Sequence, residues 1–453
     1  MDTVFPQSLA APQRERAMRM ALAGLILFLA ISDGLDWQLS LGRGLSAKNM
    51  ILYMLALAIA MKFVVQQNFR FELHSIQACF GILLIYAIVS LLAAGYGFDY
   101  SRSQMLQSAM AMKGQILDHA VFFLVFFYGL RETGSAYGLI RFLLLAAVFA
   151  NCAAVLDAFG LIRLGEMEIR TDGRVEGVIG ESNQYAAYVC LFLPGLFAAG
   201  LMSHGIRRAA WFAGLLISTA AFIMAVSRGA YVAVAVAIVW GAALFPRYIS
   251  MTRIIVAGSA LLGVIVLTLV VGSTRYGELL AERIIGQSAA GDLVGMSSGR
   301  TEIWSTAIMR MAEMPVSFIT GFGWNAYDLM PFRYATHNYY VWLWFNLGLV
   351  GLLCGILLFA LVVREARAAA DYVAAKDRPV LLAFVVGTLA FAIATFFVDL
   401  YSPWTWFWSY AGLAMRIAVN TRKQAAQQVV ETMPAQEPFP RRDPFGWAGT
   451  ARQ

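Results

Sequence analysis

The chain has 453 residues, of which 60% are hydrophobic and only 13% are charged. Soluble domains carry roughly 45–50% apolar residues, so this composition excludes a soluble globular protein and predicts a polytopic membrane protein. The formal net charge is +7, but no basic stripe with interleaved aromatic residues accompanies it, and we therefore expect no nucleic-acid partner.

Runs of about twenty apolar residues, enough to cross a bilayer as a helix, recur along the whole chain. About twelve spans are predicted, so residues 1–419 form one all-α transmembrane domain. The four cysteines fall within spans and are expected to be small packing residues. The predicted spans are 19–34, 49–65, 76–94, 114–130, 139–158, 184–202, 209–226, 230–245, 254–272, 338–363, 380–398 and 405–419.

The loops between spans differ in their basic residues. With the N-terminus inside, most of the 34 Lys and Arg residues fall in inner loops, as the positive-inside rule requires. An even number of spans then places both termini inside and the long polar segment 273–336 outside. The polar tail 420–453 contains four prolines and is predicted to be disordered and cytoplasmic.

Two polar clusters precede the long segment. Arg174 to Ala186 comes before the sixth predicted span, and Ser182 or Asn183 is expected to cap its helix. Arg228 lies at the short junction of the seventh and eighth spans, where an arginine is costly unless it snorkels, pairs or meets a ligand.

The long segment itself carries a third cluster around Arg300. Ser298 or Gly299 is predicted to cap a helix that Pro315 stops. Arg300 would then lie in the first turn, where free backbone N–H groups and a guanidinium could converge on an anion. A solvated surface arginine is the alternative interpretation.

His337 closes the long segment where the next span begins. Its imidazole could accept a proton near neutral pH, although a helix-start residue without a catalytic role is an alternative. Metal catalysis is not expected, because Glu166 and Glu168 form the only candidate carboxylate pair, and we expect no cofactor.

These clusters fit one chemistry. Guanidiniums at a membrane–water boundary suit a lipid-linked diphosphate, to which arginine gives two parallel hydrogen bonds. A neutral base nearby suits activation of a hydroxyl nucleophile. Together they predict glycosyl transfer from a polyprenyl-diphosphate carrier.

The motifs also resemble those of a known family, the O-antigen ligase and polymerase superfamily, over about residues 170–365. The resemblance implies a fold like the C-type membrane glycosyltransferases in the bacterial inner membrane, with a metal-independent site on the periplasmic face. It implies an undecaprenyl-diphosphate-linked glycan as donor, and lipid A–core or a growing polysaccharide as acceptor. The motifs that carry it are Gly177 to Ala186, Ser227-Arg228-Gly229, Ser298-Gly299-Arg300 with Trp304, Gly321-Phe322-Gly323, His337-Asn338-Tyr339-Tyr340 and Gly348 to Gly351.

By that resemblance Arg228 and Arg300 bind and stabilise the diphosphate, and His337 is the catalytic base. Asn183, Asn338 and Tyr339 are expected to contribute to substrate binding. Ligase and polymerase share this donor chemistry, and the sequence does not separate them. A transporter or flippase of lipid-linked glycans is the rival from another class. If His337 is not the base, Glu181, Asp118 and His119 are the alternatives.

Overall fold

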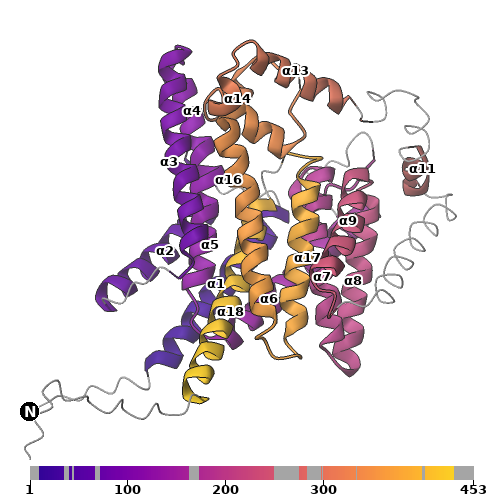
Figure 1. Ribbon diagram of the computed structural model, residues 1–453. Coiled ribbons are helices and arrows are strands. Elements are labelled where there is room, and N and C mark those ends of the chain that lie inside the picture. Colours follow the sequence, from indigo (N-terminus) through magenta and orange to yellow (C-terminus); the bar gives the residue numbers. More distant parts are fainter. Residues whose placement is uncertain are drawn as a thin grey trace, which may run out of the picture.

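The structure is a bundle of roughly antiparallel helices (Figure 1). This computed structural model describes residues 10–34, 40–42, 45–66, 72–162, 173–248, 275–282, 297, 299–332, 334–399 and 403–432. Within these ranges the only strands are β1 (Ser40–Gly42) and β2 (Leu45–Ser46), which pair antiparallel. The helices are α1 (Ala10–Gly34), α2 (Ala47–Gln66), α3 (His74–Gly97), α4 (Arg102–Met112), η1 (Lys113–Leu117), α5 (Asp118–Tyr128), α6 (Thr133–Ala158), η2 (Gly177–Ile179), α7 (Ser182–Leu201), α8 (Gly205–Met224), α9 (Arg228–Leu244), α11 (Arg275–Ala281), α13 (Arg300–Ala312), α14 (Ser317–Thr320), α15 (Ala326–Leu329), α16 (Tyr339–Ala370), α17 (Arg378–Ala394) and α18 (Pro403–Thr432).

The helices confirm a multi-pass membrane protein. In the described chain, seven helical segments are long and apolar enough to cross a membrane: α2, α3, the continuous α4–η1–α5 rod, α6, α7, α8 and α16. The apolar helices α9 and α17 are shorter, and α1 and α18 also overlap predicted spans. The total of twelve stays a prediction, because the predicted span 254–272 lies outside the described residues.

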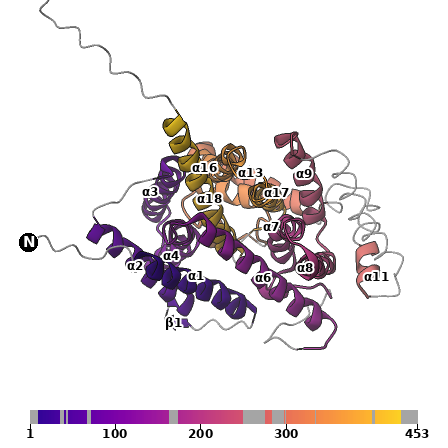
Figure 2. The same cartoon turned by 90° about the horizontal axis from the view of Figure 1, so that it is seen from below.

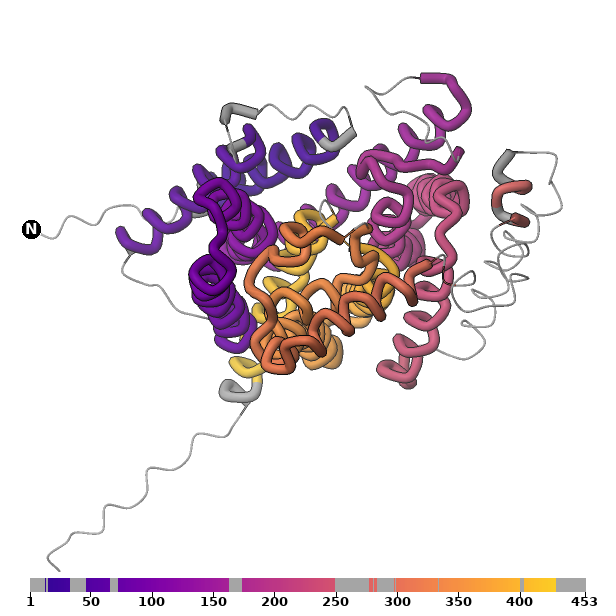
Figure 3. Tube along the Cα trace, turned by 90° about the horizontal axis from the view of Figure 1, so that it is seen from above, coloured from indigo at the N-terminus to yellow at the C-terminus, as the bar shows by residue number. Residues whose placement is uncertain are grey.

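The central helix of the bundle is α18, because nearly every residue from Trp404 to Val419 is buried. It packs against α5, α6 and α16, while α17 packs against α7 and α9. Seen from below (Figure 2) and from above (Figure 3), α3 to α5 lie on one side of α16 to α18, and α9 lies on the other. The sequence predicts a disordered tail over 420–453, but its first part is helical, because α18 continues to Thr432. Residues 433–453 lie outside the described chain.

The predicted span 338–363 is not one straight helix. Its backbone breaks at Gly348, which has φ 59° and ψ −157°, a conformation open essentially to glycine alone. A Cβ added at Gly351 or Gly355 would lie 2.2 or 2.4 Å from leucines that precede the break. Residues Tyr339–Leu347, which we call the re-entrant arm, therefore fold back against the turns after Gly348. The break brings Tyr339 back into the bundle, beside Gly355.

The part of the long polar segment from Arg300 onward packs on the bundle, because α13, α14 and α15 contact α16. The backbone N–H groups of Phe322 and Gly323 donate to the carbonyls of Phe345 and Asn346, each at 2.9 Å. Aromatic rings reinforce this contact, since Phe322 lies 4.7 Å from Phe345 between ring centroids. The bundle end that carries α13 and α14, called here the α13 end, is therefore closed by a folded segment.

Candidate active site

His337 lies at the α13 end in a left-handed backbone conformation, with φ 48°. This region is uncommon for a residue other than glycine, and such strain persists only where the surroundings hold it. Within the described chain the other non-glycine residues of this kind are Asp99, Val226 and Asn325. Val226 lies two residues before Arg228, so two of the predicted site residues adjoin strained backbone.

The carboxylate of Asp399 holds the strained turn at His337. Its Oδ2 accepts from the backbone N–H of His337 at 2.7 Å. Its Oδ1 accepts from the N–H of Asn338 at 2.9 Å and from the Thr336 hydroxyl at 2.5 Å. Burial raises the pKa of the Asp399 carboxyl, and these hydrogen bonds and the neighbouring His337 act in the opposite direction. One buried side chain thus fixes three consecutive residues.

Asn338 begins α16. Its Oδ1 accepts from the N–H groups of Tyr340 and Val341 at 3.0 and 3.1 Å, which makes it a helix N-cap. Its Nδ2 is buried and has no hydrogen-bond partner among the described residues. Asn338 therefore has a structural role, and the two N–H donors of its Nδ2 stay available for a ligand.

Tyr339 packs its ring against Trp404, with the ring centroids 4.9 Å apart. Its backbone N–H donates to the carbonyl of Thr395 at 2.9 Å. The half-buried side chain lines two neighbouring cavities, so this residue faces space that a substrate group could reach.

Arg300 lies in the first turn of α13, as predicted, and is its first residue; Gly299 before it is the N-cap and adopts φ 78°. One turn later, the indole N–H of Trp304 donates to the carbonyl of Thr336 at 2.8 Å. Residues four apart share one helix face, so Trp304 brings the face that carries Arg300 against the turn at His337.

Arg228 is the first residue of α9. The glycine after it lies against the ring of Phe397, because a Cβ at Gly229 would be 2.4 Å from that ring. Phe397 precedes Asp399 by two residues. The start of α9 is therefore joined to the carboxylate that holds His337.

Asn183 supports this junction from α7. Its Oδ1 accepts from Arg174 Nη2 at 2.9 Å and from the Ser227 hydroxyl at 3.0 Å. Its Nδ2 donates to Glu181 at 2.9 Å, and Arg174 also donates to the carbonyl of Ala225. The side chain of Asn183 is thus engaged in holding the turn before Arg228. The predicted cap at Ser182 or Asn183 is wrong, since the carboxylate of Glu181 accepts from the N–H of Gln184 at 2.7 Å.

The short stretch Thr395–Asp399, called here the hub turn, brings these elements together. Its Thr395 carbonyl accepts from Tyr339, and its Phe396 ring lies 5.3 Å from that of Trp304. Phe397 meets Gly229 and Asp399 holds the turn at His337. The helix starts at Arg228 and Arg300 and the turn at His337 therefore converge on one five-residue stretch.

The alternative bases lie elsewhere. Asp118 pairs with Lys113 at 3.0 Å and accepts from the hydroxyl of Tyr53. Glu181 caps α7. His119 lines the same cavity as Tyr339, and Glu181 also accepts from Asn183.

No group of three metal-ligating side chains occurs in the described ranges. Glu166 and Glu168 lie outside them. The candidate site therefore consists of guanidiniums, an imidazole, an amide and a buried carboxylate.

Asp399 and Arg174 are the residues that sequence reasoning left without a role. Asp399 stands between two predicted spans, where a single acidic residue was a visible signal. Its partner His337 is 62 residues away, so no local pattern could pair them.

The fold and the site together define a polytopic helical membrane protein with a cationic and imidazole site at one end of its bundle. A family model described as O-antigen ligase matches residues 213–356. This match supports the resemblance to the O-antigen ligase superfamily over that segment. The match includes Arg228, Arg300 and His337 and ends before Asp399. A search of curated proteins found no match to the chain.

Proposed function

We propose that the protein is an inner-membrane glycosyltransferase that takes a glycan from undecaprenyl diphosphate on the periplasmic face. As an O-antigen ligase it would join that glycan to a hydroxyl of lipid A–core. The matched family supports ligase-type or polymerase-type glycosyl transfer. The donor, the acceptor and the membrane face are the parts that we add.

The observation that carries the proposal is the convergence on the hub turn. Arg228 and Arg300 are each the first residue of a helix, at its positive dipole end. Helix N-termini and guanidiniums both favour a bound diphosphate. The turn at His337 joins both helix starts through Phe397 and Trp304.

In the proposed reaction His337 accepts the proton of the acceptor hydroxyl while its oxygen attacks the anomeric carbon. The bond from that carbon to the diphosphate breaks, and the diphosphate leaves with the electron pair. Arg228 and Arg300 stabilise the negative charge that grows on it, the type of electrostatic contribution that is often largest in catalysis. Asp399 and Asn183 position His337 and Arg228, and Asn338 and Tyr339 face the substrate.

A polymerase that adds the glycan to a second lipid-linked chain is the alternative within the same chemistry. A transporter of lipid-linked glycans is favoured less, because such proteins place broken helices and ionisable groups near the bilayer midplane. The re-entrant arm is a broken helix, but it carries no acidic or basic side chain.

Deleting the gene and examining surface glycans tests the proposal. Loss of all polymer on lipid A–core supports a ligase, whereas single-repeat products support a polymerase. Purified protein that moves a lipid-linked glycan between leaflets without forming a glycosidic bond would overturn both.

The orientation has its own test. Reporter fusions at Gln287 and Gln427 should report opposite compartments, with Gln287 in the periplasm. Reports from the same compartment would contradict the proposed position of the site.

A further inference from the structure

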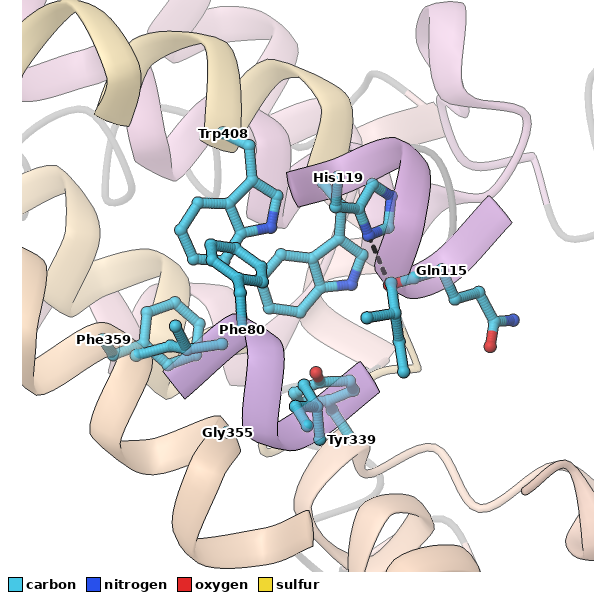
Figure 4. Close-up of a pocket in the computed structure, with 11 residues that line it drawn as sticks. Phe80, Gln115, His119, Tyr339, Gly355, Phe359 and Trp408 are labelled. Atoms are coloured by element: carbon cyan, nitrogen blue, oxygen red, sulfur yellow. Dashed lines mark hydrogen bonds between the residues drawn. The ribbon is translucent and has the colours of Figure 1, made fainter. Parts of the chain in front are cut away.

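Two adjoining cavities lie beside the re-entrant arm, and the proposed reaction has not used them. One is lined by Gln115, His119, Tyr339 and Trp404 among others. The second shares Gln115, Tyr339 and Trp404 and extends to Trp324 and Asp399. Figure 4 shows His119 and Gln115 on one wall of the first cavity, with Tyr339, Phe359 and Trp408 on the others. The cavities therefore reach from η1 to the carboxylate that holds His337.

Polar atoms without a partner border these cavities. The indole Nε1 of Trp324 and the side-chain oxygen of Gln115 are buried and have no hydrogen-bond partner in the described chain. Trp324 is only 1% exposed. Burying a donor or acceptor without a hydrogen-bond partner costs free energy. A polar group that enters the cavities could pair with the N–H of Trp324 and the oxygen of Gln115.

His119 adds a further acceptor. Its Nδ1 lies 2.6 Å from the backbone carbonyl of Gln115. A carbonyl oxygen can only accept, so Nδ1 carries the hydrogen and the Nε2 of a neutral ring is left as an acceptor.

A π-helical turn positions Gln115 and His119 on the cavity wall. In a regular α-helix, residues five apart point about 140° away from each other. The wider turn of η1 (Lys113–Leu117) instead lets Lys113 and Asp118 pair on the side of α2, with Tyr53. Gln115 and His119 then line the cavities next to α16 and α18. Single π turns are frequent at functional sites.

The wall can be reached from outside the bundle. Every residue from Ala109 to Gln115 keeps part of its surface exposed. The α4 segment just before it contains Ser103, Gln104, Gln107 and Ser108, which is unusually polar for a membrane helix. Polar side chains of α4 therefore border this approach, together with the apolar residues Ala109 to Met112.

The cavity size limits the occupant. The two spaces measure about 20 and 30 Å³, and a water-sized group needs roughly 10–15 Å³. A whole sugar ring does not fit, whereas an exocyclic hydroxyl or hydroxymethyl group does. Aromatic rings at the rim, such as Tyr339 and Trp404, suit the apolar face of the ring that carries it.

The position of the cavities favours the acceptor sugar, and not the donor glycan, as their occupant. α9 lies on the opposite side of α16 to α18 from α3 to α5, and α13 begins on the side of α9 (Figures 1 and 3). The helices that Arg228 and Arg300 begin thus start on the α9 side of α16 to α18, whereas Gln115 belongs to the α4–η1–α5 rod on the other side. In direct displacement the incoming hydroxyl and the leaving diphosphate lie on opposite sides of the anomeric carbon.

We propose that these cavities form an acceptor subsite that takes a hydroxyl-bearing edge of the acceptor sugar, with Gln115 and Trp324 as specificity residues. This inference rests on the proposed glycosyl transfer for its choice of acceptor.

The test uses full-length protein in lipid nanodiscs. Gln115→Leu removes the side-chain oxygen acceptor and Trp324→Phe removes the indole N–H, and each keeps a comparable side-chain shape. Each should raise the acceptor KM about three- to tenfold, the effect of one neutral hydrogen bond, with donor binding unchanged. Matched controls are Gln424→Leu on the exposed end of α18 and Trp240→Phe, which is 57% exposed on α9. Lipid A–core and a second lipid-diphosphate-linked repeat, offered separately, show which source supplies the sugar.

Direct binding of delipidated core oligosaccharide and of a free repeat-unit oligosaccharide, both without donor, separates this inference from the proposed function. Weaker binding in Gln115→Leu and Trp324→Phe but not in the controls supports the subsite even if no transfer occurs. Unchanged oligosaccharide binding and unchanged KM in folded variants would overturn it, and the cavities would then hold only water.

Discussion

The two ends of the bundle satisfy their polar groups in different ways. At the end opposite α13, Arg416 is 6% exposed, donates to Glu72 at 2.7 Å and to the carbonyl of Phe127 at 2.8 Å, and stacks 4.1 Å over the Phe127 ring. Lys423 pairs with the same carboxylate of Glu72. That arginine is enclosed by partners of the chain itself, so its role is to hold α18 against α3 and α5.

The α13 end is organised around strain and unsatisfied groups. All four left-handed non-glycine residues in the described ranges lie in turns at this end. Buried atoms of Asn338, Trp324 and Gln115 lack partners there. Strain of this kind persists where function requires a fixed geometry. The side-chain oxygen of Gln77 at the opposite end is also without a partner, so the clearest contrast lies in the strained turns, which we propose serve ligand binding.

The largest effect should come from His337. His337→Ala and His337→Gln should each lower turnover about 10²–10⁴-fold, because both remove the proton acceptor, while donor binding persists. Turnover and donor affinity are measured on purified protein, with His204→Ala at the opposite end as the control. Near-normal turnover in well-folded His337→Ala would show that the base lies elsewhere, with His119 the next residue to test.

The arginines sharpen the comparison between the ends. Arg228→Ala and Arg300→Ala should each lower turnover about 10²–10³-fold by removing stabilisation of the leaving group, and lysine should restore it only in part. Arg416→Ala should instead cost about 1–3 kcal/mol of stability, because it removes the hydrogen bonds to Glu72 and to Phe127 and leaves Glu72 with Lys423 alone. Thermal unfolding and turnover per folded molecule distinguish the two patterns. The distinction between the ends fails if Arg416→Ala lowers turnover as much as Arg228→Ala does.

Asp399→Asn should reduce turnover by about 10–10²-fold. An amide keeps the shape but turns one acceptor into a donor against the N–H groups of the turn, at a cost of about 1–3 kcal/mol. Thr336→Val, which removes only the hydroxyl donor, is the milder companion variant. Equal turnover in Asp399→Asn and the wild type would show that the turn at His337 holds without this carboxylate.

Gly348→Ala should destabilise the protein by about 1–3 kcal/mol, because alanine is strained at this backbone conformation. The added Cβ would also lie 2.1 Å from the carbonyl oxygen of Ile319. Gly24→Ala in α1, which has open space around it, is the matched control and should be neutral or stabilising. Thermal unfolding measures both, and equal effects would contradict the re-entrant arm.

The smallest effect should come from chelation. Excess EDTA should leave the turnover of purified protein with a lipid-diphosphate donor unchanged, because arginines supply the positive charge. Loss of activity that a divalent cation restores would instead point to Glu166 and Glu168.

The sequence by itself determined the membrane class, because twenty-residue apolar runs leave few alternatives to spanning helices. It also predicted that Arg300 begins a helix, since glycine and proline signals are local. The family resemblance rested on motifs in order along the chain, which a sequence displays directly.

Only the tertiary structure decided how those motifs meet. The re-entrant arm depends on a single glycine conformation at Gly348, and hydropathy alone describes residues 338–363 as one apolar span. Asp399 of the hub turn bonds His337 across 62 residues. The second cavity brings Gln115 of η1 together with Trp324 in the turn before α15. Contacts of this kind depend on packing between elements, which the spacing of residues along the chain does not encode.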